Sequence, residues 1–281
     1  MRIALLHPGN MGVTVGTCAA EAGHQIGWLA AGRSAATQKR AQSGSFNPYE
    51  HLAELLDDSD ITISVCPPDA AQSTAEDVAR HNFCGLYVDA NAVSPDTARS
   101  IAKTVEAAGA SYVDAGIVGP PARKPGTTRI YLSGERSAEL EPCFANTALT
   151  AIVMGSSQTA ASALKMCYAA WTKGSAALLL SVAALAASED VAMELYDEWA
   201  LSIPDLAVRL NAAAAANAPK AWRFEGEMQE IATTYAANGL PAEFHQAAAS
   251  IFSSLSKFKD CSPVPNLDEV IRKMVEDAAS T

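Results

Sequence analysis

Neither a basic excess nor a block of like charge occurs in this sequence. Twenty lysines and arginines stand against 31 acidic residues, which gives a net charge of −11. Proteins that bind nucleic acid or an anionic membrane usually present a basic face, so neither partner is expected here. The acidity fits ordinary solubility, and a local basic pocket could still bind a phosphate.

Patterns of cysteines and metal ligands are also missing. The six cysteines form no CxxC pair and have none of the spacings of a disulfide framework. Most lie in apolar stretches, where a free thiol behaves as a small hydrophobic group. No HExxH motif or carboxylate cluster suggests a metal site. We therefore expect a cytoplasmic protein with free thiols and no bound metal.

Long hydrophobic runs are scarce. The apolar run at the N-terminus stops at Pro8 and Gly9, too soon for a signal peptide. The longest apolar segment, Gly174–Ala187, is bounded by Lys173 and Glu189 and is too short to cross a bilayer. These features predict neither a targeting segment nor a membrane segment.

The first half of the chain alternates short β-like runs with helical segments. Strands are expected at residues 2–7, 25–31, 60–68, 85–91, 110–116, 128–134 and 150–155, and helices at 11–23, 34–44, 69–82 and 94–109. Ser94 followed by Pro95 is a typical N-cap with proline at the first helical position. The alternation predicts an α/β domain, a Rossmann-type doubly wound parallel sheet covered on both faces.

After Gly155 the composition changes. From Gln158 to about Ala187 alanine dominates and Gly174 is almost the only helix breaker, and the rest is helical pattern interrupted by prolines. The shift predicts an α/β domain at 1–157 and an all-α domain at 158–281. A long helix that is apolar on more than one face needs burial, so we expect it at the centre of a homodimer.

The turn after the first strand, residues 7–12, has glycines where a dinucleotide fold needs them. Gly9 allows the backbone to approach a pyrophosphate, and Gly12 allows the helix to pack on the strand. His7 stands at the first glycine position, so the rigid Pro8 would set the bend. The helix would begin at Asn10 and Met11 and present its N–H groups to an anion. A plain βα turn without a ligand is the alternative.

The end of the second strand indicates which dinucleotide is bound. An NAD site usually has an acidic residue there for the ribose 2′-hydroxyl. This chain has Arg33 and Ser34 instead, with Lys39 and Arg40 one to two turns later. An arginine fork suits a phosphate, so the pattern predicts NADP(H). The alternative is a solvated basic helix start.

These motifs resemble the β-hydroxyacid dehydrogenase superfamily, which contains 3-hydroxyisobutyrate and 6-phosphogluconate dehydrogenases, in a branch with a divergent C-terminal helical domain. The family's GLGxMG turn stands here as HPGNMG, its wall motif matches VCPP, and its DxSTxSP stands as DANAVSP. The resemblance implies an NADP-binding Rossmann domain at 1–157 and a helical substrate and dimerisation domain at 158–281. It also implies a set of cofactor-binding residues, namely Gly9, Asn10, Met11, Gly12, Arg33, Ser34, Val65, Cys66, Pro67 and Asn91.

The same resemblance points to catalytic and substrate residues. The family's GxxGxGxxxKxxxN stands as GSSQTAASALKMCYA, with Lys165 at the lysine and Ala169 in place of the asparagine. Its DAPVSGG stands as DAGIVGP, in which only one residue of the Ser-Gly-Gly trio survives. This implies a retained acid/base and a rebuilt substrate pocket. The motif positions give Asn91, Val118 and Gly119 as candidate substrate-binding residues. Apart from the resemblance, Lys173 lies eight residues after Lys165 on nearly the same helix face, and it is either a substrate-binding residue or a solvated charge. His245 is a further substrate-binding candidate, with a structural role as the alternative.

Lys165 lies on an apolar helix directly after the nucleotide domain, where its amine is partly desolvated. It would supply a proton to a carbonyl oxygen while hydride passes from the nicotinamide to the carbonyl carbon. A lysine that snorkels from a buried helix is the alternative.

The sequence leaves three functions open: an oxidoreductase for a small carbonyl compound or hydroxy acid, an imine reductase, and a non-catalytic NADP(H) sensor or scaffold. Substrate identity, direction and any coupled decarboxylation stay open.

Overall fold

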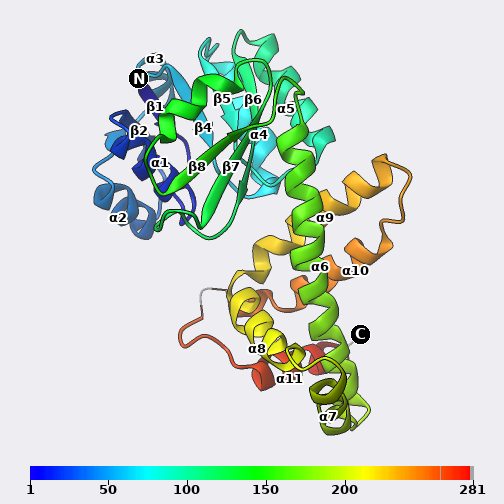
Figure 1. Cartoon of the computed structure of the whole chain (residues 1–281). Coiled ribbons are helices and arrows are strands. Elements are labelled where there is room, and N and C mark those ends of the chain that lie inside the picture. The colour runs from blue at the N-terminus through cyan, green and yellow to red at the C-terminus, as the bar shows by residue number, and fades with distance from the viewer. Residues whose placement is uncertain (260, 279–281) are drawn as a thin grey trace. The chain divides into compact units, whose positions relative to one another are not determined.

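The computed structural model describes residues 1–259 and 261–278, and the chain packs as two compact units (Figure 1). The first unit is Met1–Met166 and the second begins at Cys167. The division falls inside helix α6 (Ala160–Ser188), nine residues after the boundary expected near 157. The first two turns of α6 therefore belong with the sheet of the first unit.

An eight-stranded sheet in the order β3-β2-β1-β4-β5-β6-β7-β8 forms the centre of the first unit. Its strands are β1 (Arg2–Leu5), β2 (Gln25–Leu29), β3 (Asn47–Tyr49), β4 (Ile61–Ser64), β5 (Leu86–Asp89), β6 (Ser111–Val118), β7 (Thr128–Ser133) and β8 (Leu149–Val153). The sequence did not indicate β3, a three-residue strand at the sheet edge that contains Pro48. An edge is where proline is tolerated, because it has no N–H to donate.

The expected Rossmann-type fold is confirmed, and one pair of neighbouring strands departs from the parallel arrangement. Strands β6 and β7 are antiparallel, whereas every other neighbouring pair is parallel. A parallel pair needs a crossover of a dozen or more residues. Only a short loop joins Val118 to Thr128, so the chain must turn back on itself there.

Helices cover both faces of this sheet. They are α1 (Gly12–Glu21), α2 (Ala35–Ser43), α3 (Leu52–Asp57), α4 (Pro68–Arg80), α5 (Pro95–Ala107) and the 3₁₀ helix η1 (Ser137–Phe144). Successive strand residues point to opposite faces. Ile3 and Leu5 share one buried core with α1 and η1, and Ala4 and Leu6 share another with α4 and α5. The predicted cap of α5 is confirmed, since Ser94 accepts from the N–H of Thr97.

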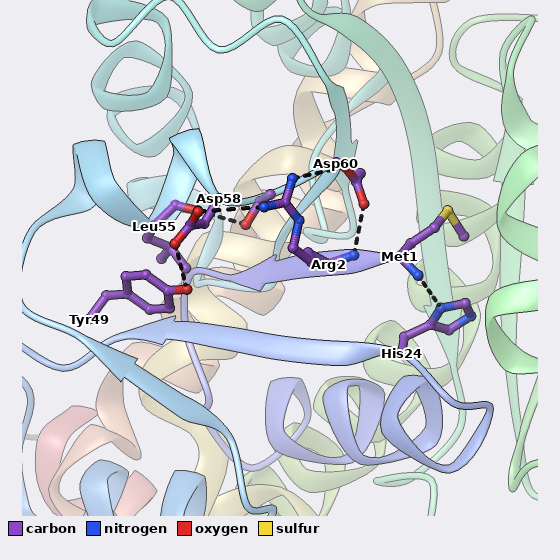
Figure 2. Close-up of polar contacts among 8 residues, drawn as sticks. Met1, Arg2, His24, Tyr49, Leu55, Asp58 and Asp60 are labelled. Atoms are coloured by element: carbon purple, nitrogen blue, oxygen red, sulfur yellow. Dashed lines mark hydrogen bonds and ion pairs between the residues drawn. The ribbon is translucent and has the colours of Figure 1, made fainter.

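A polar network closes the amino edge of the sheet (Figure 2). The backbone N–H of Arg2 donates to Asp60 at 2.9 Å, and its guanidinium pairs with Asp58 and Asp60, each at 3.5 Å. The Tyr49 hydroxyl donates to the other oxygen of Asp58 at 3.1 Å. The charged groups are about half exposed, so each pair adds little stability. The residues at this amino edge bind one another, and the glycine turn lies at the opposite, carboxyl edge of the sheet.

The second unit is helical. After α6 come α7 (Ala192–Ser202), α8 (Leu206–Asn217), η2 (Ala218–Lys220), α9 (Ala221–Ala237), α10 (Glu243–Ser254), η3 (Ser256–Phe258) and α11 (Leu267–Ala278). Helix α6 is longer than the apolar segment noted in the sequence, and by length and composition alone it is sufficient to cross a membrane. The core helix of a soluble protein has the same properties, and Lys173 of α6 forms an ion pair with Glu227 of α9.

Candidate active site

The glycine turn after β1 is closed around Pro8. The N–H of Gly9 donates to the carbonyl of His7 at 2.8 Å, so residues 7–9 make a tight turn with Pro8 at its centre. A Cβ on Gly12 would lie 2.2 Å from the oxygen of His7, which leaves room only for glycine. A Cβ on Gly9 would meet nothing within 4 Å. Gly12 thus packs the helix on the turn, and Gly9 borders open space.

The N-terminus of α1 faces this turn without a neutralising group. The helix has Met11 at its N-cap, no side-chain cap and no acidic residue in its first turn. Asn10, just before it, is exposed. The N–H groups of Val13 and Thr14 bond to the carbonyls of Gly9 and Met11, and the positive end of the helix dipole attracts anions. The predicted phosphate-binding residues therefore lie where their backbone suits a phosphate.

Two buried nitrogens beside the turn lack a hydrogen-bond partner among the described residues, Nδ1 of His7 and Nε of Arg33. The Nη2 group of Arg33 donates to the carbonyl of Leu6 at 3.2 Å. Burial and the Arg33 charge lower the pKa of His7 to about 4, so its imidazole is neutral at pH 7. Buried polar atoms are normally satisfied, so this pair fits a ligand with hydrogen-bonding oxygens.

Helix α2 adds hydroxyl and guanidinium groups to the same edge. Ser34 caps α2 by accepting from the N–H of Thr37 at 3.3 Å, and the two hydroxyls lie 3.1 Å apart. Arg40 donates to the Thr37 hydroxyl at 2.8 Å and to the carbonyl of Pro8 at 3.2 Å. We name Arg33, Ser34, Thr37 and Arg40 the basic corner.

Thr37 was missed in the sequence, and Arg40 was seen only as a basic neighbour. The signal that could have found them is their spacing, since residues 34, 37 and 40 are three apart. Positions three or four apart lie on one face of a helix. The donors of the basic corner suit a phosphate, and none of its members is acidic.

The segment after β4 that matches the family's wall motif, Val65–Pro67, lies next to the glycine turn, and cofactor binding by these residues stays a prediction. A side chain at Gly12 would lie 3.6 Å from Cβ of Val65, so this residue borders the start of α1. Pro67 is exposed and caps α4. Burial raises the pKa of Cys66 to about 11, which keeps its thiol protonated and unreactive.

Asn91 has its side chain engaged inside the protein. Its Oδ1 accepts from the N–H of Cys66 at 2.6 Å, and its Nδ2 donates to Ser64 at 3.1 Å and Asp89 at 2.5 Å. Both amide hydrogens are therefore used, and the residue is buried. The geometry makes Asn91 a tie between the ends of β4 and β5; ligand binding by this residue stays a prediction.

Lys165 lies in the second turn of α6, against strand β6. Its Nζ donates to the carbonyl of Ile117 at 2.7 Å, and the side chain is partly buried. A Cβ on Gly116 would lie 2.7 Å from the oxygen of Ala161 and 3.2 Å from Cβ of Lys165. The absence of a side chain at Gly116 thus lets the helix rest directly on the strand. Lys165 does not snorkel into solvent; it is held at the end of β6.

The candidate substrate residues at the end of β6 have clear structural roles. Val118 is the last residue of the strand and is buried. Gly119 has a φ of 121°, and a Cβ there would lie 2.3 Å from the oxygen of Thr127. A glycine is therefore required by the turn toward β7, whatever the ligand.

Lys173 and His245 belong to the second unit. Lys173 pairs with Glu227 at 2.6 Å, and both side chains are 12% exposed. Lys173 is therefore not a solvated charge. His245 is 4% exposed, and its Nδ1 has no hydrogen-bond partner among the described residues. Its ring packs at a tilt against Tyr235, with the ring centroids 4.2 Å apart. Burial lowers the pKa of His245. Contact of either residue with a substrate stays a prediction.

Two family patterns match this chain. Residues 2–155, more than half of the chain, match the NAD binding domain of 6-phosphogluconate dehydrogenase. Residues 186–255 match a domain of unknown function, DUF1932. The first match covers the sheet and the glycine turn, and the second covers much of the helical unit. In the described residues no group of three or more His, Cys, Asp or Glu could hold a metal.

Two curated relatives align with part of the chain. An uncharacterized 28.5 kDa protein of Methanothermus fervidus is 34% identical over 155 residues, which is 55% of this chain and 59% of that protein. The mitochondrial 3-hydroxyisobutyrate dehydrogenase of Drosophila melanogaster is 26% identical over 137 residues, 47% of this chain and 41% of that enzyme. The chain thus spans about half the length of the curated relatives it matches.

Solved structures share the fold over nearly the whole chain. The 3-hydroxyisobutyrate dehydrogenase of Mycobacterium tuberculosis, solved with L-serine, has a TM-score of 0.71 at 20% identity and covers 97% of this chain and 98% of its own. The reductive aminase of Aspergillus terreus, in complex with NADPH and ethyl levulinate, has a TM-score of 0.55 at 19% identity and covers 97% and 99%. At these identities the likeness establishes the fold.

Proposed function

The chain belongs to the β-hydroxyacid dehydrogenase superfamily through its 6-phosphogluconate dehydrogenase-type NAD-binding domain, and we propose that it is an NADP(H)-dependent oxidoreductase acting on a small carbonyl compound. The fold and the nicotinamide-binding domain are those of oxidoreductases. The reaction we propose interconverts a carbonyl compound and a hydroxy acid or alcohol by hydride transfer, with Lys165 as acid/base. The observation that carries it is the seating of the Lys165 ammonium at the carbonyl of Ile117.

The basic corner supports NADP(H) as the cofactor. Arg33 and Arg40 bring two guanidinium groups to the end of β2, and Ser34 and Thr37 bring two hydroxyls. A 2′-phosphate accepts from all four donors, whereas a ribose 2′-hydroxyl is usually held by a carboxylate. The glycine turn and the uncapped start of α1 suit the pyrophosphate.

Lys165 supports the acid/base step. A bound nicotinamide would supply or accept the hydride. The ammonium of Lys165 donates a proton to the carbonyl oxygen of the substrate during reduction and takes it back during oxidation. Its bond to Ile117 orients the amine, because a lysine side chain otherwise samples many rotamers. Holding this donor in place lowers the entropy cost of reaching the transition state.

We also propose that the protein is a cytoplasmic homodimer built around α6. Trp171, Leu178 and Leu185 are 70%, 50% and 62% exposed, and they follow one another at intervals of seven residues. Residues seven apart lie on nearly one face of a helix, so the three make an apolar stripe. A second copy of the same helix would cover the stripe. All six cysteines are free thiols, as a reducing compartment requires.

Turnover with purified protein tests the proposed function. NADPH and NADH are each offered with a panel of small aldehydes, ketones and keto acids, and separately with a panel of imines. We expect carbonyl reduction with NADPH that is lost in Lys165→Ala. Imine reduction that survives this substitution would instead establish an imine reductase. Tight NADPH binding without turnover of either panel would establish a sensor or scaffold.

A further inference from the structure

Strand β6 holds the start of α6 at three points. Ile117 accepts from the ammonium of Lys165, and Gly116 leaves the space in which the helix rests. The third point is Asp114, a carboxylate with no exposed surface that lies beneath the first turn of the helix. Neither the glycine turn nor the proposed acid/base step uses Asp114.

The Asp114 carboxylate is bonded on both oxygens. Its Oδ1 accepts from the hydroxyl of Ser162 at 2.5 Å, and its Oδ2 accepts from the N–H of Ser162 at 2.7 Å and from the hydroxyl of Ser133 at 3.1 Å. The Ser133 oxygen in turn accepts from the N–H of Ala161 at 2.9 Å. Two N–H groups of the first helical turn are therefore satisfied by side chains of β6 and β7.

This arrangement acts as a helix cap supplied by a neighbouring strand. The first N–H groups of a helix have no partner within the helix, and a negative charge is stabilised at that end by the helix dipole. Burial raises the pKa of Asp114, whereas the bonds from Ser162 and Ser133 act in the opposite direction and favour the carboxylate. The charge and the helix start thus stabilise one another.

Asp114 also belongs to a buried polar row that crosses the sheet. Ser64, Asp89, Asp114 and Ser133 are register partners on the successive strands β4, β5, β6 and β7. All four are buried. Asn91 donates to Ser64 and Asp89 of this row and accepts from the N–H of Cys66. The row therefore extends from the segment after β4, Val65–Pro67, to the first turn of α6.

We propose that Asp114 is a positioning residue that fixes the first turn of α6 on β6 and so sets where the Lys165 ammonium lies. Ser162 is three residues before Lys165, close to one helical turn, so a shift of the turn at Ser162 moves the amine by a comparable amount. The inference rests on the proposed acid/base role of Lys165. Asp114 itself touches neither the reacting atoms nor the cofactor turn.

Three substitutions disturb the contact between β6 and the first turn of α6 in different ways. Asp114→Asn keeps the volume, removes the charge at the helix start and reverses one hydrogen bond, because the amide nitrogen would donate to the Ser162 hydroxyl that now donates to Asp114. Gly116→Ala leaves Asp114 intact and pushes the helix outward, because its Cβ would lie 2.7 Å from the oxygen of Ala161. Ser162→Ala is the mildest change, since only the hydroxyl bond is lost. Asp96→Asn on the exposed start of α5 is the matched control.

The experiment combines kinetics with chemical labelling of the Lys165 amine, read by mass spectrometry on the full-length protein. We expect Asp114→Asn and Gly116→Ala to lower kcat about 10- to 100-fold, with little change in the NADPH dissociation constant, because misplacement of a catalytic group by about 1 Å has costs of that order. The pH profile of kcat should shift, and labelling of Lys165 should become several-fold faster. Ser162→Ala should lie between these variants and the control.

The result that overturns the inference is folded Asp114→Asn and Ser162→Ala protein in which labelling and kcat both match the control. Failure of the proposed function would be seen in a different measurement, namely substrate turnover that survives Lys165→Ala. Labelling is measured without substrate, so it reports the seating of the amine in either case. If Asp114→Asn does not fold, Ser162→Ala and Gly116→Ala decide the question.

Discussion

The ammonium nitrogen of Lys165 lies 2.7 Å from the carbonyl oxygen of Ile117, at the end of a central strand. Lys165 is the only charged residue in the first two turns of α6. A lysine on the surface of an apolar helix normally extends into water. Here the ammonium is bound at the carboxyl end of β6. Strand β6 is next to β5, and β5 is next to β4, which is followed by the segment Val65–Pro67. The predictions below start from this position and from the glycine turn.

Replacement of Lys165 should separate chemistry from cofactor binding. Lys165→Met keeps the apolar length of the side chain and removes the proton donor, so we expect kcat to fall by about 10² to 10⁴. The NADPH dissociation constant, measured by fluorescence titration, should be unchanged, because the residues of the glycine turn are untouched. A kcat that stays near the wild-type value contradicts the acid/base role. Lys103→Met on α5, which removes an exposed lysine charge away from this site, is the control.

The basic corner should decide between the two dinucleotides. Loss of a hydrogen-bonded charged group costs about 1.5–3 kcal/mol, which corresponds to about 10- to 100-fold in affinity. We therefore expect Arg33→Ala and Arg40→Ala each to raise the KM for NADPH by this factor and to leave the KM for NADH nearly unchanged. Steady-state kinetics with both cofactors measures the ratio. An equal loss for the two cofactors would show that the arginines only support the fold of the turn.

The two glycines of the turn should respond in opposite ways to alanine. Gly12→Ala forces a contact of 2.2 Å with the oxygen of His7, so it should lower the free energy of unfolding by about 1–3 kcal/mol. Gly9→Ala meets nothing within 4 Å, so the protein without cofactor should keep its stability. Its added methyl group should nevertheless weaken NADPH binding about tenfold or more, because it fills the space beside the turn. Thermal unfolding with and without NADPH distinguishes the two effects, and equal behaviour would contradict this account.

Asp89 should make the stability of the protein depend on pH. Burial, and then the neighbouring charge of Asp114, raise the pKa of Asp89 from 3.8 to about 7. A carboxyl with a higher pKa in the folded state binds its proton more tightly when folded. As the pH rises from about 4 to above 7, the folded protein must ionise a buried group, so the free energy of unfolding falls, by an amount on the order of 4 kcal/mol.

Asp89→Asn isolates this contribution. The amide is neutral at every pH and can still accept from the N–H and side chain of Asn91, as Asp89 does. Below pH 4 the variant and the wild type should have similar stability, and between pH 4 and 8 the variant should become progressively more stable relative to the wild type. Urea unfolding across this range measures the difference, with Asp96→Asn as the exposed control. Parallel curves for wild type and Asp89→Asn would contradict the raised pKa.

The apolar stripe on α6 should control oligomeric state. Leu178→Glu places a charge in the centre of the stripe, where a second copy would have to bury it. We expect light scattering to report a dimer for the wild type and a monomer for this variant. Glu198→Gln on α7 also alters an exposed residue of the helical unit and should leave the dimer intact. A wild-type monomer at micromolar concentration would overturn the proposed dimer.

Much of the fold could be predicted because its determinants are local. The alternation of strands and helices, the cap formed by Ser94, and the close packing at Gly12 depend on residues near one another in the chain. The antiparallel pairing of β6 and β7 was missed because apolar runs look alike in both orientations, although the short connection between Val118 and Thr128 was a signal for it. The candidate site was predicted only in part. The motifs located Lys165 and Arg33 in the sequence, but not the carbonyls of Ile117 and Leu6 to which these side chains donate.

By itself the sequence determined which segments form strands and helices, where the glycine turn lies and which lysine follows the nucleotide domain. Backbone sterics, capping and hydrophobic periodicity act over a few residues, so they are visible in the order of amino acids. Only the tertiary structure decided that Arg40 reaches the carbonyl of Pro8, 32 residues away, and that Asp114 caps a helix 48 residues later. Such contacts depend on sheet register and on the seating of helices on strands, which many distant residues set together.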